Sequence, residues 1–184
     1  YPANHSRLVE TRLLKGMILE LIGDRKGAKK ELEWAARQIQ RIFGANHPRL
    51  IRPLASLSKL YSDLKNLERA EKLWKRAFKI AGQYLDVSHP HYISLQIDQA
   101  LLLMKKAHYF QAESKLKACL QSLEIMNGLD SQSLVPVLEP MAILLRAQGR
   151  NQEAASHLIR ILEIRRETQG IGHPRSEEHT SELQ

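Results

Sequence analysis

The sequence is poor in the residues that several classes of protein depend on. It has one cysteine in 184 residues, so no internal disulfide framework can form, and we expect a reducing compartment, the cytoplasm. No apolar run approaches the ~18 residues that a membrane-spanning helix needs, and no signal peptide is visible. Aromatic residues are only 5% of the chain, which leaves few rings to stack on bases and disfavours specific recognition of single strands.

Catalytic patterns are also missing. There is no phosphate-binding glycine loop, and the carboxylates show no pairing suited to acid–base chemistry. Cys119 falls at the same repeat position as Ala35 and Ala77, which indicates a buried structural residue rather than a nucleophile. We therefore expect no enzymatic activity of the chain's own, no cofactor and no metal.

What the chain does contain is a repeat with a period of 42 residues. His47 recurs as His89, further steps reach Ser131 and His173, and one step back reaches His5. A small residue of the second half of each unit recurs in the same register: Ala28, Ala70, Ala112 and Ala154. No insertion or deletion breaks this register, so the sequence predicts a stack of similar units, each contacting its neighbours.

Each unit contains two amphipathic helical patterns. In the second unit, apolar residues return every three or four positions from Leu50 to Leu64, and again from Leu67 to Ala81. The predicted helices are 6–22 and 25–43, 48–64 and 67–85, 90–106 and 109–126, and 132–148 and 151–168. Because short polar turns join the two helices of a unit, they must be antiparallel neighbours.

Small and large residues alternate where these helices should meet. The small positions are Gly16, Ser58, Ala100 and Ala142 on the first helices and the four repeated alanines on the second. The large positions are Leu19, Tyr61, Leu103 and Leu145, then Leu32, Trp74, Leu116 and Leu158. Small against large in fixed register predicts close interdigitation of the helices.

Turn residues mark the boundaries of the units. Gly44 and Gly128 suit left-handed residues after a helix, with Gly170 at the equivalent place, and Ser6 and Ser131 suit helix N-caps. Pro48 and Pro90 suit a first helical position. Pro136 and Pro140 predict that the first helix of the fourth unit starts late or kinks.

The two ends of the sequence lie outside the regular repeat. Residues 1–174 are expected to form four repeats plus the start of a fifth at His173-Pro174, as a fragment of a longer array. The last ten residues, 175–184, read RSEEHTSELQ and resemble a translated sequencing adapter. We expect this tail to be non-native and exclude it from fold reasoning.

Paired helices with this pattern of small and large residues resemble tetratricopeptide repeats, whose usual unit is ~34 residues. The longer unit with a Gly-x-x-His-Pro turn is similar to the kinesin-light-chain type. The resemblance implies an all-α, right-handed α-solenoid of antiparallel helix pairs, about eight helices in all. It also implies a protein-interaction scaffold or adaptor, with the first helices lining a concave face that binds a peptide or partner protein.

The kinesin-light-chain pattern carries an Asn-Asn-Leu-Ala run on its first helices, whose asparagines clamp a peptide backbone. The matching runs here, such as Leu13-Leu14-Lys15-Gly16 and Ile97-Asp98-Gln99-Ala100, contain no asparagine. The groove positions that the resemblance implies for partner binding are Met17, Glu20, Arg52, Lys59, Ile97, Leu101, Met104 and Arg146. The alternative for the apolar members of this set is burial against neighbouring units.

Other interpretations remain open beside this one. The repeated histidines would lie too far apart in stacked units for one metal ion, so we interpret them as turn residues. A net charge of +8 and two basic helix faces, at Lys29, Lys30, Arg37 and Arg41 and at Lys72, Lys75, Arg76 and Lys79, could bind nucleic acid or another anionic partner. The chain could also be the sensing array of a larger signalling enzyme or ATPase.

Overall fold

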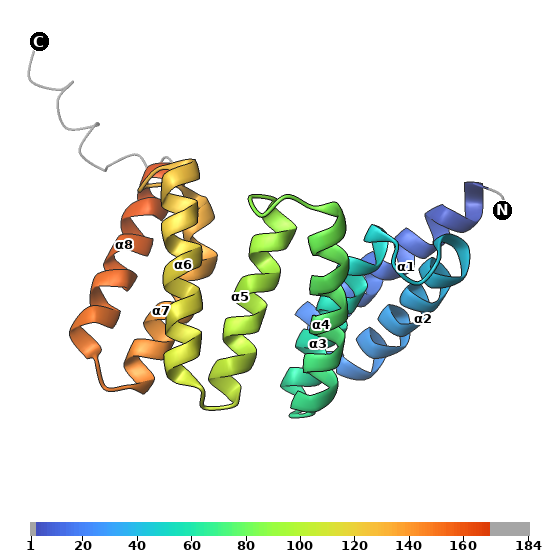
Figure 1. The fold of residues 1–184 in the computed structure, drawn as a ribbon, viewed down its shortest axis with the longest axis horizontal. Helices are drawn as coiled ribbons and strands as arrows, with labels where there is room; N and C mark the ends of the chain where they lie inside the picture. The colour runs from blue at the N-terminus through green and yellow to red at the C-terminus, as the bar shows by residue number, and fades with distance from the viewer. Residues whose placement is uncertain (1–2, 170–184) are drawn as a thin grey trace, which may run out of the picture. The chain divides into compact units, whose positions relative to one another are not determined.

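The computed structural model describes residues 3–169, and every regular element in that range is helical (Figure 1). The elements are α1 (Ala3–Leu21), α2 (Arg25–Phe43), η1 (Pro48–Leu50), α3 (Ile51–Asp63), α4 (Leu67–Tyr84), α5 (Pro90–Lys105), α6 (Tyr109–Asn127), η2 (Gln132–Leu134), α7 (Val135–Ala147) and α8 (Asn151–Gln169), the two η elements being short 3-10 helices. The all-α prediction is confirmed. His173-Pro174, Gly170 and the expected tail lie outside the described residues.

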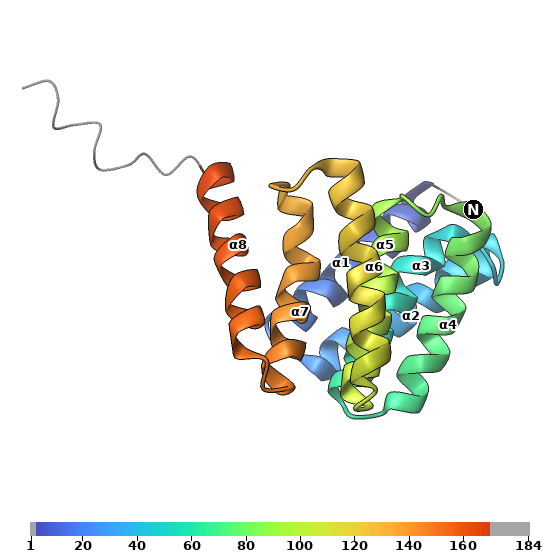
Figure 2. The same ribbon diagram turned by 60° about the vertical axis from the view of Figure 1, so that its left-hand side comes forward.

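The chain divides into two compact units, residues 1–115 and 116–184, with the boundary inside α6. The first unit contains the hairpins α1–α2 and α3–α4, followed by α5. The second contains the hairpin α7–α8, whose helices lie side by side in both views (Figures 1 and 2). The second helices begin at residues 25, 67, 109 and 151, so the 42-residue period of the sequence is also the period of the helices.

Two of the repeated histidines, His47 and His89, are helix N-caps. His47 precedes Pro48 and accepts the backbone N–H of Arg49 on Nδ1 at 3.2 Å, and His89 accepts that of His91 at 3.1 Å. Ser131 caps η2 in the same way. The prediction for Ser6 is wrong, because it lies inside α1, which begins at Ala3. Position 6 corresponds to the prolines at 48 and 90, which keep the preceding residue out of a helix, and serine has no such effect.

The fourth repeat starts late, as its prolines predict. A 3-10 turn comes first and α7 begins at Val135, with Pro136 in its first turn. The helix then continues through Pro140. The second repeat does the same, since η1 precedes α3 and Pro53 falls in the first turn of that helix. Gly44 and Gly128 have the expected positive φ, at 94° and 86°.

The turn inside each repeat has one residue with positive φ at the same place in all four copies. These residues are Gly23 at 85°, Lys65 at 60°, Ala107 at 60° and Gly149 at 78°. A side chain at φ near 60° is strained for any residue with a Cβ, so two of the four turns hold a conformation that glycine would adopt more easily. The backbone of the turn is therefore repeated even where its residue type is not.

Close packing within the hairpins follows the small positions. Ala28, Ala70 and Ala112 have no exposed surface, and Ala154 is only 4% exposed. Ser58 is buried and donates its hydroxyl to the carbonyl of Ala70 at 2.8 Å. A Cβ added to Gly16 would come 2.9 Å from Cγ of Leu32. The predicted close approach of the two helices is confirmed.

One large position departs from the pattern. Leu32 and Leu116 are fully buried and Trp74 is 6% exposed, but Leu158 on α8 is 50% exposed. The expectation that Leu158 fills a packed layer is wrong for the described residues. In the first unit, the helix that follows Trp74 in the chain covers it, and no described helix follows α8.

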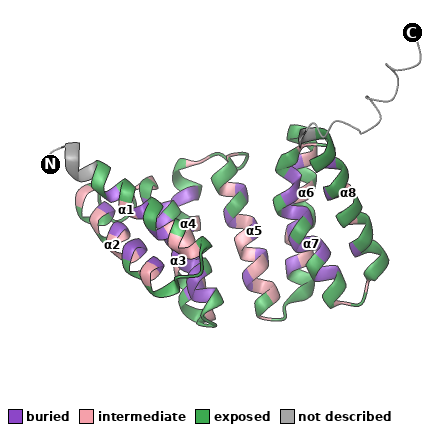
Figure 3. Cartoon of the chain, turned by 180° about the vertical axis from the view of Figure 1, so that it is seen from behind, coloured by how far each residue is buried: buried purple, intermediate pink, exposed green. Residues whose placement is uncertain are grey.

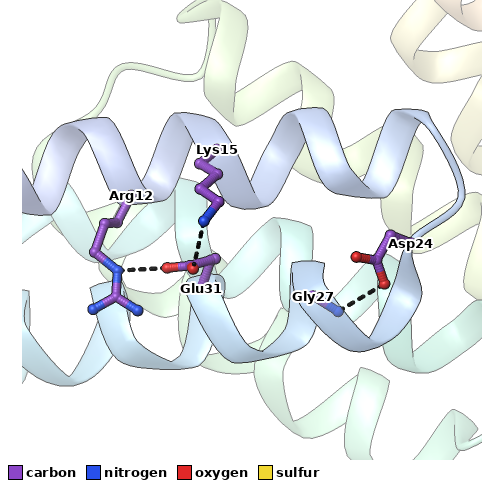
Figure 4. Close-up of polar contacts among 5 residues, drawn as sticks. All are labelled: Arg12, Lys15, Asp24, Gly27 and Glu31. Carbon is purple, nitrogen blue, oxygen red and sulfur yellow. Dashed lines mark hydrogen bonds and ion pairs between the residues drawn. The ribbon is translucent and has the colours of Figure 1, made fainter.

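Buried charge stabilises the first hairpin (Figure 4). Glu31 on α2 is 7% exposed, and its carboxylate lies between Arg12 and Lys15 of α1, with Arg12 Nε at 2.5 Å and Lys15 Nζ at 3.2 Å. The hydrogen bond from Arg12 outweighs burial and lowers the pKa of Glu31. The same view shows the carboxylate of Asp24 accepting the backbone N–H of Gly27, which caps α2.

The junction between the second and third repeats combines apolar and polar contacts. The indole N–H of Trp74 reaches the carbonyl of Leu95, and the rings of Phe78 and Tyr92 lie 5.0 Å apart. Two ion pairs flank them, Lys106 to Glu71 and Lys105 to Asp63, each at 2.5 Å. These contacts fix α5 against the hairpin before it.

Candidate functional site

A cavity of about 350 Å³ opens among the first helices of the first unit. We call it the central cavity; its wall comes from α1, α3 and α5 only, through residues Met17, Glu20, Leu21, Ile51, Arg52, Ala55, Ser56, Lys59, His91, Ser94, Leu95 and Asp98. Successive first helices contact each other, which brings residues about 40 positions apart in sequence to one surface. The cavity therefore lies on the face that the resemblance predicted for partner binding.

Charged groups of both signs meet in the central cavity. Lys59 Nζ lies 3.8 Å from Glu20 Oε1, an ion pair too long for a hydrogen bond, and this buried oxygen has no hydrogen-bond partner within the described structure. A guanidinium nitrogen of Arg52 lies 3.6 Å from Sδ of Met17. The cavity thus holds a carboxylate oxygen and cations whose hydrogen-bonding capacity is incompletely used.

Burial shifts the pKa of both carboxyl groups upward. The pKa of Asp98 rises to about 6, chiefly because burial disfavours its charge; Lys59 lowers it and Glu20 raises it further. The pKa of Glu20 is also raised, first by burial, against the attraction of Lys59. Two carboxyl groups share one ammonium, so the cavity changes charge near neutral pH.

A second, larger cavity of about 450 Å³ adjoins the first, and we call it the end cavity. Its wall is mostly apolar: Val9, Leu13, Ile39, Phe43, Ile51 and Leu85, with Glu10, His47, Pro48, Arg49, Arg52, His89 and His91 also lining it. The guanidinium of Arg49 lies over the ring of Phe43, 4.8 Å from its centroid, and the ring of His47 stacks on that of Phe43 with 4.7 Å between the ring centroids. Burial, with His89 and Arg52 nearby, lowers the pKa of His91.

The two cavities share Ile51, Arg52 and His91 as lining residues. They are therefore neighbouring parts of one surface depression that runs along α3. One part is apolar and the other carries charge, an arrangement that fits a ligand with one bulky apolar group beside polar ones.

Four of the eight residues predicted from the sequence to bind a partner line the central cavity, and the other four do not. Met17, Glu20, Arg52 and Lys59 line the central cavity together. On α5, Leu101 and Met104 are half-buried and Ile97 is only 9% exposed, so Ile97 offers little surface to a partner. Arg146 is exposed on α7 in the second unit.

Sequence reasoning did not single out Asp98, His91 or the apolar wall of the end cavity. Asp98 gave a usable signal, because the equivalent residues are Leu14, Ser56 and Pro140, and a carboxylate among them is unusual. The end cavity gave none. Its wall is built from core-type apolar residues whose spacing is that of ordinary helix packing.

Neither a metal-binding cluster nor a membrane-spanning helix is present among the residues that the structure describes. No group of three or more His, Cys, Asp or Glu side chains suited to a metal ion occurs within residues that the structure describes. The rings of His89 and His91 lie 5.4 Å apart as a pair. Over the same residues, none of the helices combines the length and apolarity needed to cross a bilayer.

The basic helix faces take part in internal contacts. Lys75 pairs with Glu71 at 2.9 Å, and Arg37 lies 3.8 Å from Glu33. Arg76 donates to Gln40 and to the carbonyl of Ala45, at 2.8 and 2.9 Å. Part of the positive charge on these two faces is therefore paired within the chain, which leaves less of it to attract an anionic partner.

Comparison with known proteins identifies the repeat. The tetratricopeptide repeat model matches residues 54–91 and 141–175. No curated protein matches the chain. The fold is similar to the nearly identical TPR-like repeats of a protein described as a kinesin light chain from Podosopora anserina, with TM-score 0.67 and 18% identity over 88% of this chain and 76% of that one.

A second solved structure has the same fold. BtubC (BKLC) from P. vanneervenii superposes with TM-score 0.70 and 18% identity, over 89% of this chain and 64% of BtubC. At this identity the likeness describes the fold, and the repeat match places the family signature on the second and fourth repeats. The second and fourth repeats thus carry the tetratricopeptide repeat signature, and the fold of the chain is similar to that of solved kinesin-light-chain-like repeat structures.

Proposed function

We propose that the chain is a protein-interaction scaffold that binds an extended segment of a partner protein along the first-helix face of residues 1–115. The observation that supports this is the central cavity, whose wall is contributed by three successive first helices. A ligand lying across α1, α3 and α5 would contact three repeats at once, which no single hairpin could provide. Tetratricopeptide repeats commonly form such surfaces.

The two cavities suggest how the segment would be held. The apolar wall of the end cavity suits a bulky apolar side chain, which would gain stability by leaving water. Arg52 and Lys59, with the hydroxyls of Ser56 and Ser94, offer donors to carbonyls or carboxylates in the central cavity. Since the first helices carry no asparagine clamp, recognition would depend on side-chain pockets more than on a clamped backbone.

The proposal is tested by selecting peptides from a random library on the purified chain and measuring their affinities by calorimetry. Lys59→Glu and Met17→Glu alter the central cavity, and we expect each to weaken the selected peptides at least tenfold, about 1.4 kcal/mol. Lys79→Glu, an exposed charge reversal on α4, is the matched control and should leave affinity unchanged.

Two results would contradict the proposal. One is a set of peptides that bind all three variants as well as they bind the parent chain. The other is a set that loses affinity only with the α4 variant, which would move the binding surface to the second helices.

A further inference from the structure

A further cavity lies at the turn between α3 and α4, and we call it the turn cavity. It has a volume of about 360 Å³ and is lined by Arg25, Ser62, Asp63, Lys65, Leu67 and Lys105. These residues come from three successive repeats of the first unit. The turn that joins α3 to α4 is exposed (Figure 3). The turn cavity shares no lining residue with the central cavity or the end cavity, so it is a separate site.

Positive charge dominates the turn cavity. Three of its side chains are cations and one is a carboxylate. Lys105 Nζ lies 2.5 Å from Asp63 Oδ1, but an ammonium group has three N–H donors, so this ion pair leaves donors of Lys105 available. Arg25 and Lys65 have no carboxylate partner within the described structure. The cavity therefore holds two cations that no carboxylate of residues 3–169 neutralises.

The buried hydroxyl of Ser62 adds a hydrogen-bonding group to the wall. Ser62 is 6% exposed, and its hydroxyl has no hydrogen-bond partner among the residues described. The backbone N–H of Lys65 donates to the carbonyl of Ser62 at 3.1 Å, which holds the two residues together. Because a buried polar group without a partner costs free energy, a ligand that bonds to this hydroxyl would gain stability from it.

The three cations do not belong to the repeat pattern. None of the other described repeats has a cation at any of the equivalent positions. The equivalents of Arg25 are Leu67, Tyr109 and Asn151, those of Lys65 are Gly23, Ala107 and Gly149, and those of Lys105 are Leu21, Asp63 and Ala147. Packing of the hairpins thus requires no positive charge at these places, and the repeat fold does not explain why three cations line one cavity.

A phosphate monoester matches these groups better than a carboxylate does. It carries close to two negative charges near pH 7 and has three strong acceptor oxygens, whereas a carboxylate has one charge and two oxygens. Two of the lining residues, Arg25 and Leu67, are the first residues of α2 and α4, and the N-terminal end of a helix favours an anion nearby. Charge, donors and helix ends therefore all favour a phosphate.

The first-helix face leads from the central cavity to the turn cavity along α3. Lys59 lines the central cavity, and Ser62, three residues later on the same helix, lines the turn cavity. Residues three positions apart lie on the same side of a helix. A partner segment bound in the central cavity could therefore continue along α3 and place one of its side chains in the turn cavity.

We propose that the turn cavity binds the phosphate of a phosphoserine in the partner segment. Arg25, Lys65 and Lys105 supply the positive charge, and the hydroxyl of Ser62 supplies a neutral donor. The identity of the carrier rests on the proposed function, whereas the affinity of the cavity for phosphate does not. Phosphorylation of the partner would then strengthen its binding to the chain.

The phosphate site is tested first with inorganic phosphate alone, which needs no partner. Phosphate is added to the isotope-labelled chain near neutral pH at constant ionic strength, and the backbone amides are followed by NMR. The amides of residues 62–67 should shift and saturate. Lys65→Gly, which places at this turn the glycine found at positions 23 and 149, should weaken the fitted affinity by about fivefold. Lys79→Gln, at an exposed position of α4, is the control and should leave it unchanged.

Peptides selected on the purified chain then test the carrier. Phosphoserine is placed at each position of a selected peptide in turn, and we expect one position to raise the affinity by about tenfold. Lys65→Gly should remove this gain, while the unphosphorylated peptide should bind Lys65→Gly and the parent chain equally well. Glutamate at the same position should give a smaller gain, because it has one charge.

Failure of the phosphate site and failure of the proposed function give different results. Amide shifts that do not saturate, or that are the same in Lys65→Gly, would overturn the phosphate site. Peptides that bind but gain nothing from phosphoserine at any position would overturn the phosphoserine assignment and leave the proposed function intact. Binding to vesicles of phosphatidic acid that needs Lys65, in place of any phosphoserine gain, would overturn the assignment of the carrier. If no peptide is selected, the proposed function and the phosphoserine carrier both fail, and the phosphate titration still decides whether the site exists.

Discussion

Trp74 donates its indole N–H to the backbone carbonyl of Leu95 at 2.7 Å, inside the junction between the second and third repeats. The same repeat position is occupied by Leu158 in α8, where half of the side chain is exposed. One position of the repeat thus has two environments in one chain. Mutating each residue measures how much of that side chain's contribution to the free energy of unfolding comes from contact with the neighbouring repeat.

Trp74→Phe should lower the free energy of unfolding by about 1–2 kcal/mol, because the hydrogen bond to Leu95 is lost and the smaller ring leaves unfilled space. Urea denaturation followed by circular dichroism measures the loss. Leu158→Ala is the matched control and should change stability by no more than about 0.5 kcal/mol, as exposed substitutions generally do. Equal losses at the two positions would show that the junction contact contributes little.

Ala70→Leu should destabilise the chain by about 1–3 kcal/mol, because this alanine has no exposed surface and its carbonyl accepts the Ser58 hydroxyl at the closest approach of α3 and α4. Thermal unfolding measures the change. Ala118→Leu, at an exposed position of α6, provides the control and should be close to neutral. A neutral Ala70→Leu would mean that the helices can separate without loss.

Asp98 should make the free energy of unfolding fall as the pH rises. A carboxylate in an ion pair has the opposite effect, because its pKa is lowered on folding. The folded pKa of Asp98, about 6, lies above the ordinary 3.8, so the folded chain holds the proton more tightly. Stability from this group is complete below pH about 4 and is lost as the pH rises through 6. Asp98→Asn should therefore stabilise the chain at pH 7, by at most about 3 kcal/mol, and change little at pH 4.

Urea titrations of Asp98→Asn and the parent chain at a series of pH values provide the measurement. Asp130→Asn, a substitution of a residue in an exposed loop, is the control and should give the parent's profile. Parallel profiles for the parent chain and Asp98→Asn would contradict the assignment of the raised pKa to Asp98.

Glu31→Ala should destabilise the first hairpin by about 3 kcal/mol, because Arg12 and Lys15 would lose the buried carboxylate between them. The folded pKa of Glu31 is lowered, so its contribution is present above the ordinary value of 4.5 and is lost as the pH falls below it. Denaturation at pH 7 and pH 3 should show a smaller difference between variant and parent at pH 3. Glu10→Ala, an exposed change on α1, should be neutral at both.

The helices and their packing could be predicted because they depend on local pattern and on the repeat. Apolar spacing identified the helical segments, and the alanines at 28 and 70 marked close approaches that the structure confirms. The error at Ser6 came from treating position 6 as a cap when the equivalent residues are prolines. The error at Leu158 came from assuming a neighbouring helix, which a repeat position alone does not guarantee.

The candidate site was harder to predict than the fold. Met17 and Lys59 could be assigned to one face from the register of the first helices, and they do line one cavity. The end cavity depends on how α1, α2 and α3 pack around Leu13, Phe43 and Ile51, which spacing along the sequence does not determine. The raised pKa of Asp98 depends on its burial in the folded chain, which no local sequence pattern reveals.

The four turns inside the repeats separate backbone shape from residue type. Positions 23, 65, 107 and 149 share a left-handed backbone, yet only two of them are glycine. Replacing Lys65 or Ala107 by glycine would relieve strain of roughly 1 kcal/mol but would also free the unfolded chain by a similar amount. Because these two effects oppose each other, glycine and other residue types have similar net effects on stability at this position. The residue type can therefore vary while the backbone conformation stays the same in all four turns.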